Sequence, residues 1–163
     1  LPSNIATVKN IDITDGSQNN TVTVAVTGEG TYDFALDAIT GPYQESATFN
    51  NVAPGFHTVF VRDINDCGIS ENLISVIGFP KYFTPNNDGI NDYWQIYGIN
   101  EQFQPKSTIY IFDRMGKLLK ELNPLSQGWD GTYIDKKLPS NDYWFSVTLQ
   151  DGRIFKGHFT LKR

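Results

Sequence analysis

Cysteine, histidine and long apolar runs are all scarce in this sequence of 163 residues. The single cysteine, Cys67, cannot form an internal disulfide, so cysteine usage leaves the redox compartment open. Only His57 and His158 could serve as imidazole bases, and neither a G-x-S-x-G nucleophile motif nor an H-E-x-x-H zinc motif is present. The sequence therefore predicts a protein that is not an enzyme.

Basic residues are rare in the first half of the chain. Residues 1–77 carry nine acidic and two basic side chains, a net charge of −7, whereas residues 78–163 carry nine and eleven, a net charge of +2. Nucleic-acid binding needs clustered Lys and Arg that release counterions from phosphates, so we expect no nucleic-acid partner. No apolar run approaches the ~18 residues that a bilayer-spanning helix needs, and we expect no membrane span.

What the sequence does contain is alternation of apolar and polar residues. Period-two patterns run through residues 21–26, 32–36 and 56–63, with Gly-, Asn- and Asp-rich turn clusters between them. No segment of the first half has the i, i+3, i+4 apolar stripe of a helix. This half therefore reads as an all-β sandwich built from antiparallel strands.

The second half predicts five further strands, and a break in pattern separates the two halves. Gly78 and Pro80 interrupt the alternation, which places a domain boundary there and predicts two domains, residues 1–77 and 78–163. The fold class is thus all-β, with two tandem sandwiches. The predicted strands of the second domain are residues 93–98, 107–113, 117–122, 142–150 and 153–163.

Two hairpins of the second domain carry turn residues. Gly116 is expected to take a positive φ in the hairpin of residues 111–119. The Asp151-Gly152 pair favours a two-residue type I′ turn. That turn would place Trp144 opposite Phe159, on a buried aromatic face with room left by Gly157.

The stretch "YFTPNNDGINDYW", residues 82–94, is rich in the oxygen ligands that Ca²⁺ prefers. It fits the EF-hand pattern poorly, because Thr84 and Gln95 fall at the first and last ligand positions. The favoured interpretation is a turn closed by its own side chains, with no cofactor: Pro85 fixes φ, the Asn and Asp residues bond the backbone, and Gly89 takes a positive φ. A weak calcium site stays open as the alternative, with the candidate ligands Asn86, Asp88, Asn91 and Asp92.

Five motifs in order resemble the gliding motility-associated C-terminal domain of Bacteroidota, the type B sorting domain of the type IX secretion system. They are "FPKYFTPNNDGINDYWQIYG", "IYIFDRMGKLL", "GWDGTY", "LPSNDYWFSV" and "GRIFKGHFTLKR", spanning about residues 79–163. The resemblance implies an immunoglobulin-like sandwich, exported through the periplasm to the cell surface or extracellular space. It implies as partners the secretion translocon and an outer-membrane adaptor of the PorP/SprF type. The signature residues are Pro85, Asn87, Gly89, Trp129, Asp130, Gly131 and Tyr143.

The first half more faintly resembles the repeats of gliding adhesins such as the SprB family, whose pattern includes Cys67. The leading hypothesis is therefore the last repeat of a surface adhesin followed by its sorting domain. Lys162 and Arg163 would form a basic tip that meets an acidic partner. The alternative is a carbohydrate- or surface-binding tip. It requires exposed, coplanar aromatic rings, whereas we expect Trp129, Trp144 and Phe159 to be buried.

Overall fold

The computed structural model describes residues 4–16, 19–65 and 67–163. The described residues form strands, turns and loops without a helix, so the all-β prediction is confirmed. The chain divides into two compact units, Leu1–Gly78 and Phe79–Arg163, one residue away from the predicted boundary. No helix in the described part of the chain is long and apolar enough to cross a membrane.

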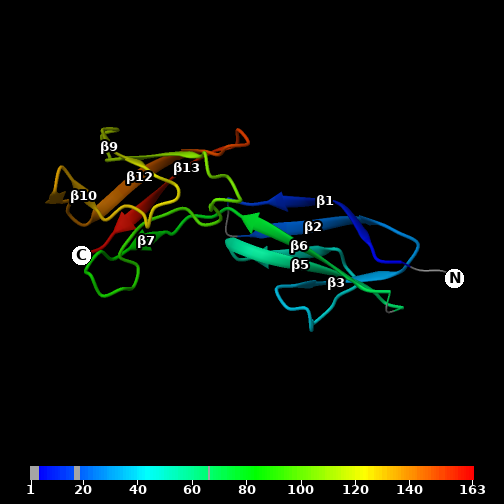
Figure 1. Cartoon of the computed structure of the whole chain (residues 1–163). Helices are drawn as coiled ribbons and strands as arrows, with labels where there is room; N and C mark the ends of the chain where they lie inside the picture. The colour runs from blue at the N-terminus through cyan, green and yellow to red at the C-terminus, as the bar shows by residue number, and fades with distance from the viewer. Residues whose placement is uncertain (1–3, 17–18, 66) are drawn as a thin grey trace. The chain divides into compact units, whose positions relative to one another are not determined.

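The first unit consists of two three-stranded antiparallel sheets that face each other as layers (Figure 1). One sheet has the order β1-β2-β4, from β1 (Thr7–Thr14), β2 (Asn20–Thr27) and β4 (Thr48–Val52). The other has the order β3-β5-β6, from β3 (Tyr32–Leu36), β5 (Gly55–Asp63) and β6 (Ile69–Val76). Apolar residues of both sheets share one core, as in a β-sandwich, including Val22, Phe34, Val59, Val61 and Val76.

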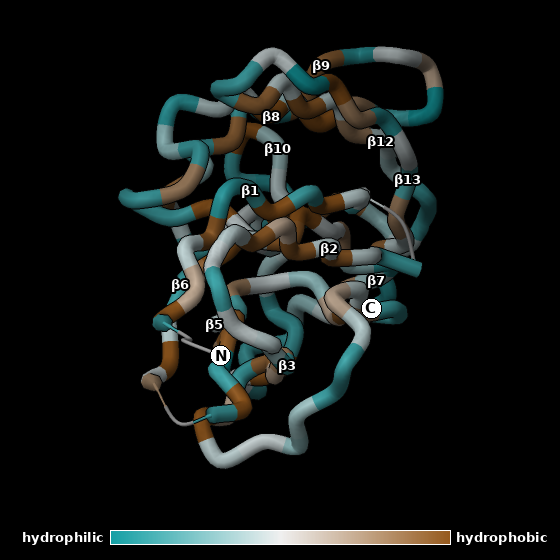
Figure 2. The backbone as a smooth tube through the Cα atoms, turned by 90° about the vertical axis from the view of Figure 1, so that its right-hand side faces the viewer, coloured by the Kyte–Doolittle hydropathy of each residue, from teal (hydrophilic) through white to brown (hydrophobic). Residues whose placement is uncertain are grey.

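The second unit has one large sheet in the order β7-β13-β12-β8-β9. Its strands are β7 (Tyr82–Phe83), β8 (Thr108–Phe112), β9 (Leu118–Leu122), β12 (Asn141–Thr148) and β13 (Ile154–Leu161). All neighbours are antiparallel except β7, which pairs in parallel with β13 and so covers the outer side of that strand. A separate ribbon joins β10 (Thr132–Tyr133) to β11 (Lys136–Lys137). In Figure 2 the tube is brown along much of β8 and β12, where the buried residues alternate.

Aromatic side chains fill the core of the second unit. Trp94 stacks on Phe159 with ring centroids 4.3 Å apart, and Phe145 lies 5.0 Å from Trp94. Trp129 meets Phe159 edge-on at 6.0 Å. Such offset and edge-on pairs add stabilisation to the burial of the large ring surfaces.

The expected strand at residues 93–98 is wrong. Trp94 makes only an isolated bridge to Trp129, in which each backbone N–H donates to the other carbonyl at 2.9 Å. Trp94 and Ile96, two residues apart, do point into the core. The side chain of Gln95, however, donates to loop carbonyls at Asn123 and Ser126, so loops rather than a ladder satisfy this segment.

The predicted register of the last hairpin is also wrong, by one residue. The loop has three residues, since Leu149 N–H donates to the carbonyl of Arg153 at 2.8 Å and Gly152 adopts φ 95°. A turn of this length ends in a left-handed glycine bulge instead of a type I′ pair. Trp144 therefore lies opposite His158, and Phe145 lies opposite Gly157.

Because side chains alternate between the two faces, that shift turns Trp144 outward and Phe145 inward. Trp144 is 38% exposed, so its predicted burial is wrong, whereas Phe159 is fully buried as expected. The space at Gly157 exists, but it is filled by the Phe145 ring, 2.9 Å from where an added Cβ would lie.

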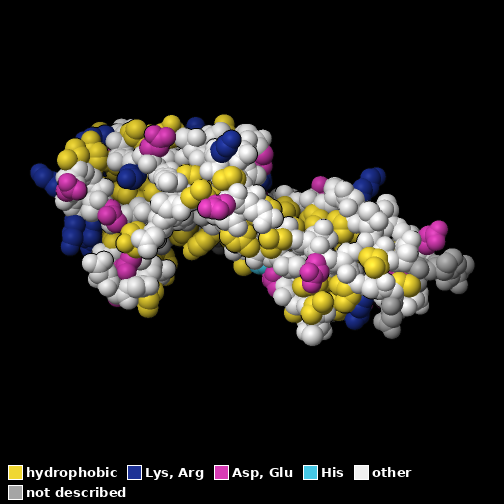
Figure 3. All heavy atoms as spheres, in the orientation of Figure 1, with side chains coloured by type: hydrophobic (Ala, Val, Ile, Leu, Met, Phe, Trp, Pro, Cys, Tyr) yellow, Lys and Arg dark blue, Asp and Glu magenta, His cyan; other side chains and the backbone are white. Residues whose placement is uncertain are grey.

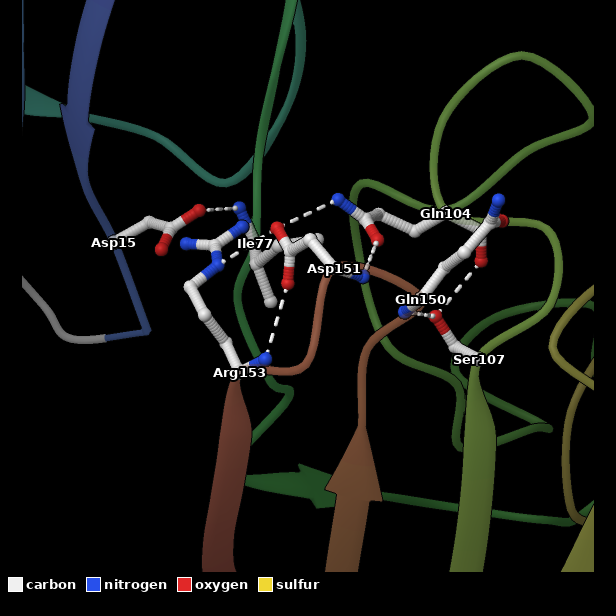
Figure 4. A network of polar contacts seen from close by, with 7 residues as sticks. All are labelled: Asp15, Ile77, Gln104, Ser107, Gln150, Asp151 and Arg153. Atoms are coloured by element: carbon white, nitrogen blue, oxygen red, sulfur yellow. Dashed lines mark hydrogen bonds and ion pairs between the residues drawn. The ribbon is translucent and has the colours of Figure 1, made fainter.

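A polar network holds the three-residue loop (Figure 4). The Asp151 carboxylate accepts from Arg153 Nε at 3.0 Å and from Gln104 Nε2 at 2.9 Å, and Gln104 Oε1 accepts from Asp151 N–H at 3.1 Å. Ser107 Oγ accepts from the N–H of Gln150 at 3.3 Å. Burial acts to raise the pKa of Asp151, but hydrogen bonds and charge from Arg153, with Gln104, outweigh it and lower that pKa.

The shorter hairpin between β8 and β9 is confirmed. Gly116 has φ 82°, its N–H donates to the carbonyl of Asp113 at 3.0 Å, and Asp113 N–H donates to the carbonyl of Lys117 at 3.0 Å. The Asp113 carboxylate accepts from the N–H groups of Met115 and Lys117, both at 2.9 Å. An Asp at this position thus caps the turn that it begins.

Candidate functional site

The loop of residues 84–92 is organised around the carboxylate of Asp92. Its Oδ1 accepts from the N–H groups of Asn86 at 3.1 Å and Asn87 at 2.9 Å, and its Oδ2 accepts from Gly89 at 2.8 Å. Asn87 and Gly89 have φ values of 61° and 83°, which turn their N–H groups toward the carboxylate. Charge-assisted bonds of this kind are among the stronger ones in proteins, so Asp92 is the residue that closes the loop.

The other predicted oxygen ligands also serve the loop itself. Asn86 Oδ1 accepts from Asp88 N–H at 3.1 Å, and Asp88 Oδ1 accepts from Ile90 N–H at 2.8 Å, which are the Asx turns expected from the sequence. Asn91 contributes its carbonyl to Thr84 N–H at 2.7 Å and has φ 52°. In the described ranges no three His, Cys, Asp or Glu side chains gather as a metal site would require. That the loop needs no metal stays a prediction.

The Trp129-Asp130-Gly131 turn anchors a second loop in the core. The Trp129 side chain is 2% exposed, and its Nε1 donates to the carbonyl of Thr132 at 3.0 Å. Asp130 Oδ1 accepts from both the N–H and the hydroxyl of Thr132, at 3.1 and 2.7 Å. Gly131 has φ 82°, and a Cβ there would lie 2.7 Å from a methyl of Leu161, so the position requires glycine on both counts.

Tyr143 links β12 to a third loop. Its ring lies 5.3 Å from that of Trp129, and its hydroxyl donates to the carbonyl of Pro139 at 2.8 Å. Burial raises the pKa of Tyr143 above its usual value, an effect that the charge of Arg163 partly offsets. A phenol kept neutral in this way remains a donor to Pro139.

Arg163 binds all three loops. Its Nε donates to the carbonyl of Leu138 at 2.6 Å, its Nη2 to that of Gly131 at 3.0 Å, and its Nη1 to that of Pro85 at 3.5 Å. Its backbone N–H donates to Ser140 Oγ at 2.8 Å. The planar guanidinium suits such convergence, because it presents several donors in fixed directions.

Lys162 behaves differently from its neighbour. Its ammonium lies over the ring of Tyr82, 4.6 Å from the centroid, at an exposed position. Of the two residues expected to form a basic tip, Lys162 therefore faces outward while Arg163 serves the unit's own loops. That either residue contacts a partner stays a prediction.

The first two of the three loops line a cavity of about 220 Å³ together with Lys137 and Arg163. Of the predicted signature residues, Pro85, Asn87 and Asp130 line this cavity, and Gly131 accepts from Arg163, which also lines it; Gly89, Trp129 and Tyr143 are not among the lining residues. The role of Arg163 was missed from the sequence, because a terminal basic pair shows no periodicity that would indicate contact with distant carbonyls. The full lining is Pro85, Asn86, Asn87, Asp92, Tyr93, Asp130, Thr132, Lys137 and Arg163.

Aromatic residues also lie on the outer face of the large sheet. Phe112, Trp144 and His158 are cross-strand neighbours on β8, β12 and β13. The rings of Trp144 and His158 are 5.9 Å apart and tilted by 38°, and Tyr110 and Phe112 are tilted by 45°. These tilts do not give the coplanar platform that a flat sugar-binding surface requires.

The comparisons with known proteins point to one family. The family model described as CHU_C type IX secretion signal domain matches residues 77–161, slightly more than half of the chain. No curated protein matches the chain.

Several solved structures align over nearly the whole chain at low similarity. A biofilm associated protein (BSP domain) has 15% identity, covering 95% of this chain and 29% of that one, with a TM-score of 0.33. Dimeric latent PorU from Porphyromonas gingivalis has 13% identity, covering 96% and 20%, with a TM-score of 0.32. SGBP-B of a Bacteroides ovatus mixed-linkage glucan utilization locus, in complex with a heptasaccharide, has 15% identity, covering 98% and 42%, with a TM-score of 0.26. The chain spans less than half of each of these proteins, and only the family match bears on function.

Proposed function

This chain belongs to the CHU_C family of type IX secretion signal domains, and we propose that its second unit sorts the protein by binding an outer-membrane adaptor of the PorP/SprF type. A domain of this family directs its protein to the type IX secretion machinery, and so to the cell surface or the extracellular space. The observation that carries the proposal is the family match, which runs from residue 77 to residue 161 and so spans the second unit almost entirely.

A folded surface, rather than a linear tail, is what we expect the machinery to read. The first and last strands of the unit, β7 and β13, are neighbours in the sheet, with Tyr82 opposite Thr160 and Phe83 opposite Leu161. Arg163 then fixes three loops at that end. A sorting signal made of contacts between the two ends of its sequence is present only when the unit is folded.

The first unit fits the role of a spacer in a surface adhesin. It is a β-sandwich with a net charge of −7 over residues 1–77, which favours a solvated rod segment over a binding core. We propose that neither unit is catalytic and that neither needs a cofactor. We propose also that both are immunoglobulin-like, the second with loops and a two-stranded ribbon where a sandwich has its second large sheet.

The test is export of a cargo. All 163 residues are fused behind a reporter with its own leader into the periplasm, in cells with and without the type IX apparatus. We expect the reporter outside the cell only when the apparatus is present. A deletion of residues 159–163 removes the β7 pairing and the Arg163 contacts and should abolish export, whereas Lys162→Ala should not. Secretion of the deletion variant at full yield would contradict a folded signal.

Carbohydrate binding is the second candidate, and one observation favours it. Of Trp129, Trp144 and Phe159, only Trp144 is exposed. It lies beside His158 on the outer face of the large sheet. Titration of the chain with soluble oligosaccharides, followed by tryptophan fluorescence, tests this candidate. A saturable change that Trp144→Ala removes would establish it.

A further inference from the structure

An apolar groove of about 330 Å³ opens on the second unit, apart from the cavity at Arg163. We call it the Met115 groove. The β8–β9 turn bounds one side and β10 with the loop before β12 bounds the other. Its lining residues are Asp113, Arg114, Met115, Lys117, Leu119, Tyr133, Leu138, Pro139, Asn141, Asp142 and Tyr143.

The floor of the groove is rigid and one wall is adaptable. Leu119 and Tyr143 are buried core residues, and the Tyr143 hydroxyl is held by Pro139. Met115, at the tip of the β8–β9 turn, is 85% exposed. A flexible thioether beside a preformed apolar floor is a common feature of surfaces that receive a partner's side chain.

A second exposed apolar residue sits on a strained turn next to the groove. Ile134 follows the groove residue Tyr133 and is 75% exposed. Ile134 and Asp135 have φ values of 49° and 60°, the type I′ conformation that Asn and Gly favour and that a β-branched residue resists. Neither exposure nor backbone preference explains an isoleucine there.

The segments around the groove carry a small excess of basic side chains, and Arg114 and Lys117 are the basic residues that line it. Residues 113–117 and 132–143, the segments that bound it, carry four basic and three acidic side chains, a net charge of +1. Of the acids that line it, Asp113 binds the N–H groups of its own turn, and Asp142 accepts the hydroxyl of Thr160 at 2.6 Å and lies 3.9 Å from His158. Figure 3 shows hydrophobic, basic and acidic side chains close together at the end of this unit where Figure 1 places β10.

We propose that the Met115 groove receives an extended segment of the secretion partner, in which an apolar side chain stands next to carboxylates. The apolar side chain packs on Leu119 and Tyr143, with Met115 closing over it. The carboxylates meet Arg114 and Lys117 at the rim, where charge complementarity sets orientation and the rate of encounter. This inference rests on the proposed sorting function and gives it a place on the surface.

The test uses the full chain fused to the exported reporter. The rim variant is Arg114→Glu with Lys117→Glu, and the wall variant is Met115→Asp. The matched control is Lys106→Glu with Lys156→Glu, which makes the same change of charge at two exposed positions of the same unit outside the groove. We expect each groove variant to lower the secreted fraction at least ~10-fold and the control to stay within ~2-fold of wild type, since charge at an interface acts on encounter and orientation.

The midpoint of thermal unfolding of each purified chain distinguishes a loss of folding from a loss of docking. All five altered positions are exposed, so we expect the substitutions to leave that midpoint nearly unchanged. If the wild type is secreted and the groove variants are secreted as well as the control, the inference fails while the sorting function stands. If Trp144→Ala blocks export instead, the partner docks on the outer sheet face and the inference is overturned. If the wild type itself is not secreted through the type IX apparatus, the sorting function fails and the inference with it.

Discussion

The two units reach the same all-β class by different packing. In the first, two three-stranded sheets face each other, and valines such as Val22, Val59 and Val61 fill the space between them. In the second, one five-stranded sheet is faced mainly by loops, and the core is aromatic. Loops cannot present regular rows of small side chains, so large rings such as Trp94 and Trp129 reach from them to the sheet.

This difference makes the second unit depend on a few residues. Truncating one valine in the aliphatic core of the first unit removes only one or two methyl groups from many contacts. Truncating a tryptophan in the second unit removes the side chain that holds a whole loop against the sheet. The loops of the second unit also rely on single polar groups, Asp92 for one and Arg163 for three. Substitutions in the second unit are therefore expected to destabilise that unit and to leave the first nearly unchanged.

The largest effect is expected from Trp129→Ala. Truncating a buried aromatic residue costs about 3 to 5 kcal/mol, and Trp129 also donates to Thr132. Trp144→Ala is the matched control, because its ring is 38% exposed and should cost less than about 1 kcal/mol. Chemical denaturation measures the free energy of unfolding, and hydrogen exchange shows which of the two units is destabilised. If both variants lost the same free energy of unfolding, Trp129 would contribute no more to stability than the exposed Trp144, contrary to this prediction.

A smaller loss is expected from Arg163→Ala, about 1 to 2 kcal/mol, because hydrogen bonds from a charged donor to three loop carbonyls are lost at a partly exposed site. Lys162→Ala should stay within about 0.5 kcal/mol. Exchange protection should fall in residues 84–92 and 128–140 and remain unchanged in the first unit. An Arg163→Ala chain with full protection in those loops would show that other contacts hold them.

Acid should weaken the last hairpin through Asp151. Its lowered pKa means that it stabilises the folded chain above its unfolded pKa, near 3.8, and that this contribution is lost as pH falls through the lower folded value. The Asp151→Asn variant should be slightly less stable than wild type at neutral pH, and the difference should shrink below about pH 4. Because the side chain is 41% exposed, the effect is small. If the difference in free energy of unfolding between wild type and Asp151→Asn grew as the pH fell, the pKa of Asp151 would be raised in the folded chain and not lowered.

The smallest effect is expected from removal of metal. The carboxylate oxygens of Asp92 are already bonded to three N–H groups, so thermal midpoints with and without excess chelator should agree within a few degrees. A large drop in the second unit would instead make Asn86, Asp88, Asn91 and Asp92 calcium ligands.

Much of the candidate site could be predicted because local chemistry decides it. Asx turns at Asn86 and Asp88, and positive φ at Gly89 and Gly116, depend on residues close in sequence. Burial of Trp129 followed from a large ring beside a tight turn. The hydrogen bonds of Arg163 could not be predicted, since their acceptors, the carbonyls of Pro85, Gly131 and Leu138, are brought near only by the fold.

The amino-acid pattern is enough to specify strands, because period-two alternation leaves one face of each segment apolar and a sheet is what buries such a face. Which face of the last hairpin is inside depends on contacts that form only in the folded unit. One extra loop residue, held by Gln104 and Ser107 from a distant segment, shifts the register and exchanges Trp144 for Phe145 in the core. Alternation has a period of two, so a shift of one residue, which hardly alters local propensity, reverses every side chain along the strand.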